Sequence, residues 1–146
     1  MSFRFPLETV LRYRENLEKR EYTALGRAQQ QLTEAEIHLQ EVEGICAAAI
    51  AKREAESARG IPSVHLQDAY QHEQALILQR DALRAKRAEL QIILEQCRKA
   101  YDLARQKREV LGELRTQRLQ TYMREQSKRE QRQIDDIFLS RRKRGN

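Results

Sequence analysis

The sequence predicts an all-α protein in which two long helices form an antiparallel coiled-coil hairpin, the C-terminal helix being longer and overhanging. Of the 146 residues, 34% are charged, 5% are aromatic and none is Trp, and the mean hydropathy is -0.84. This composition is too polar for a thick globular core and is typical of long helices. Glycine and proline come within two positions of each other only at Gly60 and Pro62. On both sides of that point, apolar residues recur with heptad spacing.

The Gly-Pro pair predicts the tip of the hairpin. Gly60 can adopt the left-handed conformation that ends a helix, and Pro62 cannot continue one. Ser63 can then cap the next helix. We therefore expect a single domain, 1–146, with a helix over about 6–58, a turn at 59–63, a helix over about 64–138 and a basic tail at 139–146.

The first helix is expected to begin at Pro6, whose missing N–H costs nothing at the first helical position. It carries an unbroken heptad seam, in which alanines recur at one of the two core positions and leave room for larger residues opposite. The seam consists of Leu25, Ala28, Leu32, Ala35, Leu39, Val42, Cys46 and Ala49.

The second helix carries a matching seam of Leu76, Leu83, Leu90, Cys97, Ala104 and Leu111. If the chain folds back at the tip, opposed residue numbers sum to about 122, and the two seams then meet as antiparallel helices require. Leu39 would lie opposite Leu83.

The same register predicts two charged contacts. Arg14 and Arg108 would meet across the seam, so a stutter or fraying is expected there. Glu36 would lie near Arg84 as a weak surface ion pair.

One side of the seam differs from the other because it holds two isoleucines and no acidic residue. This side stripe could receive a partner, although scattered apolar residues are also normal on protein surfaces. The side stripe consists of Ala24, Gln31, His38, Ile45, Lys52, His72, Gln79, Lys86, Ile93 and Ala100.

Residues 118–146, the basic overhang, should have no internal partner. They contain nine basic and four acidic residues, so they hold +5 of the chain's net charge of +6. A run such as Arg141–Arg144 is more often a solvated tail. A basic helix that has apolar positions and extends beyond its hairpin is more typical of a segment that docks on a partner than of a solvated tail.

The sequence shows no motif for catalysis, for a cofactor or for a metal. It lacks a phosphate-binding glycine loop, a nucleophile elbow and a paired-cysteine metal motif. His65 and His72 are more simply surface residues, and Cys46 and Cys97 are small core residues. We expect a protein that is not an enzyme and that resides, reduced, in the cytoplasm.

Both ends of the chain, with the hairpin between them, resemble the flagellar FliJ family. The family's phenylalanine-rich start is matched by Phe3-Arg4-Phe5-Pro6-Leu7-Glu8-Thr9-Val10-Leu11 with Tyr13-Arg14. Its basic, then acidic, C-terminal segment is matched by Arg129-Glu130-Gln131-Arg132-Gln133-Ile134-Asp135-Asp136. Asp136 departs from the family's Asp-Glu pair.

This resemblance implies a soluble component of the bacterial flagellar type III export apparatus, similar to the stalk of the rotary ATP synthase gamma subunit. The implied partners are the export ATPase FliI ring, which it would link and stimulate, the export-gate membrane protein FlhA and export chaperones. The implied location is cytoplasmic, peripheral to the cytoplasmic side of the membrane at the flagellar base. No cofactor, nucleic acid or small-molecule substrate is expected.

Two surfaces are assigned to partners as a hypothesis. The ATPase would face Phe3, Phe5, Arg118, Arg124, Lys128, Arg129 and Arg132. The gate would face His38, Ile45, His72 and Gln79. The alternatives are a generic coiled-coil adaptor and a basic helical protein that binds nucleic acid.

Overall fold

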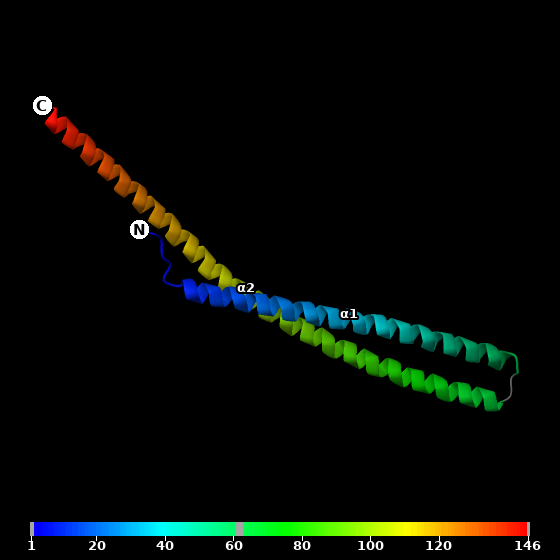
Figure 1. Cartoon of the computed structure of the whole chain (residues 1–146). Helices are drawn as coiled ribbons and strands as arrows, with labels where there is room; N and C mark the ends of the chain where they lie inside the picture. The colour runs from blue at the N-terminus through cyan, green and yellow to red at the C-terminus, as the bar shows by residue number, and fades with distance from the viewer. Residues whose placement is uncertain (1, 61–62, 146) are drawn as a thin grey trace. The chain divides into compact units, whose positions relative to one another are not determined.

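Two long helices make up almost the whole protein in this computed structural model, which describes residues 2–60 and 63–145. Helix α1 spans Glu8–Ala58 and helix α2 spans Ser63–Arg144, and no strand occurs among the described residues. Figure 1 shows α1 and α2 running side by side in opposite directions. The expected all-α helical hairpin is confirmed.

The chain divides into two compact units. The tip unit is Arg20–Tyr101, and the end unit combines Met1–Lys19 with Asp102–Asn146. Each unit contains a stretch of both helices. The side stripe belongs to the tip unit, and the basic overhang belongs to the end unit.

Helix α1 begins two residues later than the sequence predicted. Pro6 and Leu7 form a turn, in which the Glu8 N–H donates to the Phe5 carbonyl at 3.1 Å. The other end of α1 falls where it was expected. Gly60 has a φ of 74° and its N–H donates to the Ser57 carbonyl at 3.2 Å, an arrangement that satisfies a carbonyl of the last helical turn. The predicted turn residues Ile61 and Pro62 lie outside the described residues.

Helix α2 ends later than predicted. It continues through Arg144, so the expected basic tail from residue 139 is helical for six more residues. The reason is electrostatic, because the last turn of α2 holds Arg141, Arg142, Lys143 and Arg144. Cations stabilise the negative C-terminal end of a helix dipole.

The core of the tip unit follows the predicted seam. From α1, Ala28, Leu32, Ala35, Leu39, Val42 and Cys46 are all buried. From α2, Leu94 is buried in the cluster with Ala28 and Leu32, and Leu90 and Cys97 pack against them half-buried. The seam of α1 is therefore covered more completely than the seam of α2, since small alanines let the larger α2 side chains lie over it.

An ion pair between Arg53 and the buried carboxylate of Glu73 lies nearer the tip, and the sequence analysis overlooked it. Glu73 is only 5% exposed and occupies a core position of α2, three residues before Leu76. Arg53 donates to both of its carboxylate oxygens, one of them at 3.4 Å. The pair satisfies a carboxylate that would otherwise be buried without a partner.

The expected clash between Arg14 and Arg108 does not occur. Arg108 donates from Nε and Nη2 to the two oxygens of Glu18 at 2.6 and 3.1 Å. The Arg14 guanidinium lies 5.8 Å from the centre of the Tyr13 ring. Both helices remain regular through this region, so the expected fraying is wrong, and a stutter in the heptad register stays a prediction.

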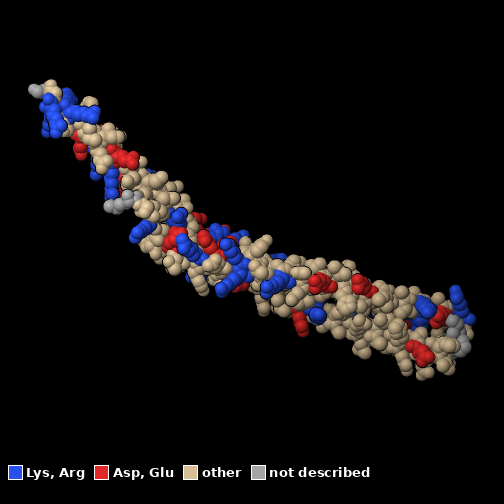
Figure 2. Space-filling model, viewed as in Figure 1, with Lys and Arg blue, Asp and Glu red and all other residues tan. Residues whose placement is uncertain are grey.

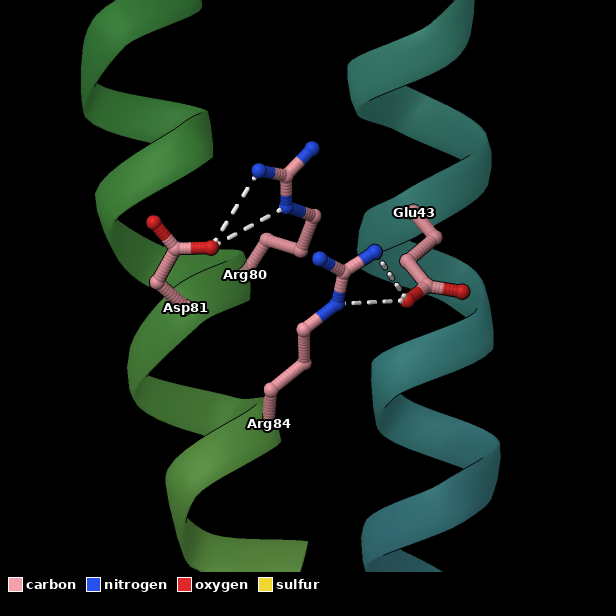
Figure 3. A network of polar contacts seen from close by, with 4 residues as sticks. All are labelled: Glu43, Arg80, Asp81 and Arg84. Carbon is pink, nitrogen blue, oxygen red and sulfur yellow. Dashed lines mark hydrogen bonds and ion pairs between the residues drawn. The ribbon is translucent and has the colours of Figure 1, made fainter.

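The predicted ion pair between Glu36 and Arg84 is also wrong, because each of the two residues pairs with a different residue. Arg84 of α2 reaches Glu43 of α1 at 3.1 Å, whereas Glu36 has Arg87 at 3.7 Å. In Figure 3, Arg84 crosses from α2 to α1, while Arg80 turns to its neighbour Asp81 on the same helix. Arg84 therefore reaches along α1 to a partner well beyond the position opposite it in the predicted register, whereas Glu36 and Arg87 lie almost directly opposite each other.

Candidate functional site

The four gate-facing candidates of the side stripe are all exposed in the tip unit. His38 and Ile45 lie on α1, and His72 and Gln79 lie on α2. Ile45 is 54% exposed, and Ile93 of the same stripe is also exposed. The stripe therefore offers apolar side chains to solvent, as the heptad pattern predicted.

A shallow groove of about 430 Å³ runs between the helices at His38. It is lined by Gln31, Glu34, Ala35, His38, Leu83, Lys86 and Leu90. The small side chain of Ala35 leaves part of this space open. Sequence reasoning did not name Glu34 among the residues on this side of the seam. Its place directly before Ala35 in α1 could have indicated that it lies there.

The opposite side of the seam carries more charge. A smaller groove of about 250 Å³ is lined by Glu36, Leu39, Gln40, Glu43 and Arg87. Its acidic residues are paired with Arg84 and Arg87. Both sides of the seam therefore carry charge, and the side stripe differs by its exposed isoleucines.

The N-terminal segment lies against α2 in the end unit and forms an aromatic clasp. The Phe3 and Tyr122 rings are 5.6 Å apart, and the Arg115 guanidinium lies 5.7 Å from the centre of the Phe3 ring. Arg115 also binds Glu8 at 3.0 Å. Phe5 is 6% exposed. We call Phe3, Phe5, Glu8, Arg115 and Tyr122 the N-terminal clasp.

The clasp changes two expectations. Phe5 is buried, so its side chain is not available to face a partner directly, and Phe3 is only partly exposed. Tyr122 has an internal partner and Gln126 is only partly exposed, so α2 is exposed on all sides from residue 127 on and not from 118. The sequence missed this because it extended the helical register through a segment that is not helical.

The five basic candidates are exposed on α2, and helical geometry places them on one side. Arg124, Lys128 and Arg132 are four residues apart and therefore follow one another along the helix. Arg118 and Arg129, eleven residues apart, lie together at one edge of this row, so the five residues span about 140° of the helix. The sequence analysis named these residues without arranging them into a face.

The surface around these basic residues also carries acidic side chains. Figure 2 shows Lys and Arg side chains gathered at the C-terminal end of α2, with acidic side chains between them. The acids of the overhang are Glu125, Glu130, Asp135 and Asp136. A protein partner with its own mixed charge pattern fits this surface better than a uniform polyanion does.

The described part of the chain shows no cluster of three metal-ligating side chains. Cys46 is a buried free thiol and Cys97 a half-buried one. Within the described residues, neither helix has a stretch long and apolar enough to cross a bilayer.

These features define a helical hairpin protein that offers long helical surfaces for binding. Comparison with protein families matches residues 3–146 to the family described as Flagellar FliJ protein. The match covers nearly the whole sequence, and the chain therefore belongs to the FliJ family. Proteins of this family are non-enzymatic components of the flagellar export apparatus. Comparison with curated proteins and with solved structures gives no match.

Proposed function

We propose that this protein links and stimulates the export ATPase FliI ring, engages the export-gate protein FlhA and contacts export chaperones during flagellum assembly. Membership of the FliJ family supports a role in flagellar export. The observation that carries the finer proposal is the exposed basic face of α2, formed by Arg118, Arg124, Lys128, Arg129 and Arg132.

The basic face is suited to a protein partner by its position. Arg124, Lys128 and Arg129 lie beyond Tyr122, where α2 is no longer covered by the N-terminal clasp. A single helix without a packing partner leaves most of its surface open to be enclosed. We propose that the ATPase ring encloses this stretch, and that the clasp sets where the enclosed stretch begins.

Charge reversal tests the ATPase assignment. Changing Arg124, Lys128 and Arg129 to Glu should weaken binding to the purified ATPase at least about tenfold, because complementary charges become repulsive. Calorimetry or biolayer interferometry measures the affinity. A matched control reverses the exposed Arg20, Arg27 and Lys99 of the tip unit and should leave the affinity within about twofold. Equal affinity of the overhang variant and the native chain would reject the assignment.

The side stripe is proposed to meet the gate. Ile45→Asp places a charge on the exposed apolar stripe and should reduce binding to the gate's cytoplasmic domain at least about tenfold while leaving helicity intact. Ile37→Asp is the matched control, because Ile37 is similarly exposed on α1 but lies outside the stripe. Gate binding that survives Ile45→Asp would remove the stripe from the proposal.

The mechanism proposed is differential binding. A ligand shifts an assembly only to the extent that it prefers one of the assembly's states. A helix that fits the closed ATPase ring better than its separate subunits would promote ring formation and thereby hydrolysis. The same chain would then bring the gate to the ATPase by binding both, and its work would take place at the cytoplasmic side of the membrane.

A further inference from the structure

The last three turns of α2 carry exposed apolar and basic residues that the proposed ATPase contact does not use. Ile134 is 60% and Phe138 65% exposed, and Ile137 is exposed as well. Four consecutive basic residues, Arg141–Arg144, follow within the helix. We call Ile134, Ile137, Phe138 and Arg141–Arg144 the terminal patch.

The terminal patch is amphipathic in the helical conformation. Ile134, Ile137 and Phe138 are three and four residues apart, so their side chains share one side of α2. Asp136 lies about 160° around the helix from Ile134 and Phe138 and about 100° from Ile137. Asp135 lies at its flank and accepts a hydrogen bond from Gln131 at 3.1 Å. The apolar side is therefore free of acidic side chains from Ile134 to the end of α2, and Glu130 lies one turn before it on the same side.

The basic residues surround the end of the helix. Successive residues are separated by about 100°, so Arg141, Arg142, Lys143 and Arg144 point to all sides of the last turn. Whichever way the helix lies, some of these side chains face a broad anionic surface. A narrow groove in a protein would instead select charges on one side.

We propose that the terminal patch binds an anionic lipid surface, with the end of α2 lying in the plane of the interface. Ile134, Ile137 and Phe138 would enter the boundary between headgroups and acyl chains, and Arg141–Arg144 would bind lipid phosphates. Basic amphipathic helices with aromatic and aliphatic residues on one side bind membranes in this way. Clusters of four or more cations next to such a side favour anionic lipid.

The exposed apolar side chains favour lipid over nucleic acid. Phosphate-driven binding to a nucleic acid needs the cations alone, and it would leave Ile134, Ile137 and Phe138 in water. A lipid interface accommodates both groups of residues. The inference rests on the proposed function, which places the protein at the cytoplasmic side of the membrane. It names residues for membrane binding that are not among those proposed to face the ATPase.

Vesicle flotation with the full purified chain, in the absence of the ATPase, tests the inference. We expect the chain to float with vesicles containing about 30% phosphatidylglycerol in phosphatidylcholine and at least about tenfold less with phosphatidylcholine alone. Changing all four residues of Arg141–Arg144 to Gln should abolish most of the flotation. The double change Ile137→Ser and Phe138→Ser should reduce it at least about threefold.

Two control variants separate the terminal patch from general properties of the chain. The control for charge changes Arg20, Arg27, Lys99 and Lys107 to Gln, and the control for apolar exposure changes Ile37 and Leu78 to Ser. Both controls should float like the native chain. Circular dichroism should show unchanged helix content in all variants, which separates lost binding from lost folding.

Three results would overturn the inference. The first is equal flotation with neutral and anionic vesicles, and the second is native flotation of the Arg141–Arg144 variant. The third is a chain that binds a DNA duplex but does not bind vesicles. The result is independent of the ATPase assignment, because the terminal variants should bind the purified ATPase with native affinity. Failure of vesicle binding with intact ATPase binding rejects only the lipid proposal, and the reverse outcome rejects only the ATPase contact.

Discussion

The ion pair of Glu18 and Arg108 in the end unit replaces a repulsion that the sequence predicted. The hydrogen bond from the Arg108 guanidinium holds the pKa of the Glu18 carboxyl below its usual range. The charges of Arg108 and Arg105 lower it further, and partial burial opposes them. Because the folded pKa is lowered, the carboxylate contributes stability above its unfolded pKa, and this contribution is lost as pH falls through the folded pKa.

The first prediction follows from this linkage. Glu18→Gln should lower the free energy of unfolding at neutral pH by about 1 kcal/mol. The difference from the native protein should shrink as the pH is lowered through the folded pKa of Glu18, where the native carboxylate becomes protonated. Urea unfolding followed by circular dichroism at several pH values measures this. Glu41→Gln, at an exposed position, should show little effect, and a pH-independent difference for Glu18→Gln would contradict the account.

Residue-level pairs of this kind limit what the sequence can predict. Heptad spacing predicts which positions face the seam, because it depends on backbone geometry alone. It placed Arg108 at the seam correctly but paired it with Arg14, since it did not consider that a long side chain can reach along the partner helix to Glu18. Glu73 was overlooked for a related reason. A carboxylate at a core position indicates that the apolar seam has ended, unless a partner such as Arg53 is known to pair with it.

At the scale of elements, the N-terminal clasp determines how much of α2 is free. The segment before Glu8 is not helical, yet it buries Phe5 and brings Phe3 to Tyr122. Helical periodicity carries no information about such a segment. The sequence therefore predicted both helices and the tip, but it could not predict the clasp. It also ended α2 too early because it treated Arg141–Arg144 as a solvated tail.

The clasp leads to a prediction about local stability. Phe5→Ala should lose about 3 kcal/mol of local stability, because a buried aromatic side chain is removed. Amide exchange should accelerate in the part of α2 around residues 111–122 and remain native in the tip unit. Hydrogen exchange with mass spectrometry measures this. Tyr13→Ala, at an exposed aromatic position, is the control, and unchanged exchange around 111–122 in Phe5→Ala would show that the clasp does not hold α2.

At the scale of the whole molecule, most of the net charge is held by one segment of the sequence. The basic overhang carries +5 of the total of +6. The remaining length has nearly balanced charge, buries the α1 seam and presents the apolar side stripe. The chain therefore carries two chemically different surfaces, the basic overhang and the apolar side stripe. The family assignment gives this division a context in flagellar export.

The most direct test of the central proposal is the hydrolysis rate of the purified export ATPase, measured while the chain is titrated. We predict that the native chain raises both the fraction of ATPase in rings and the rate of ATP hydrolysis. The variant with Arg124, Lys128 and Arg129 changed to Glu should lose this stimulation, whereas Ile45→Asp should retain it. A hydrolysis rate and a ring fraction that do not change at saturating native chain would contradict the proposal.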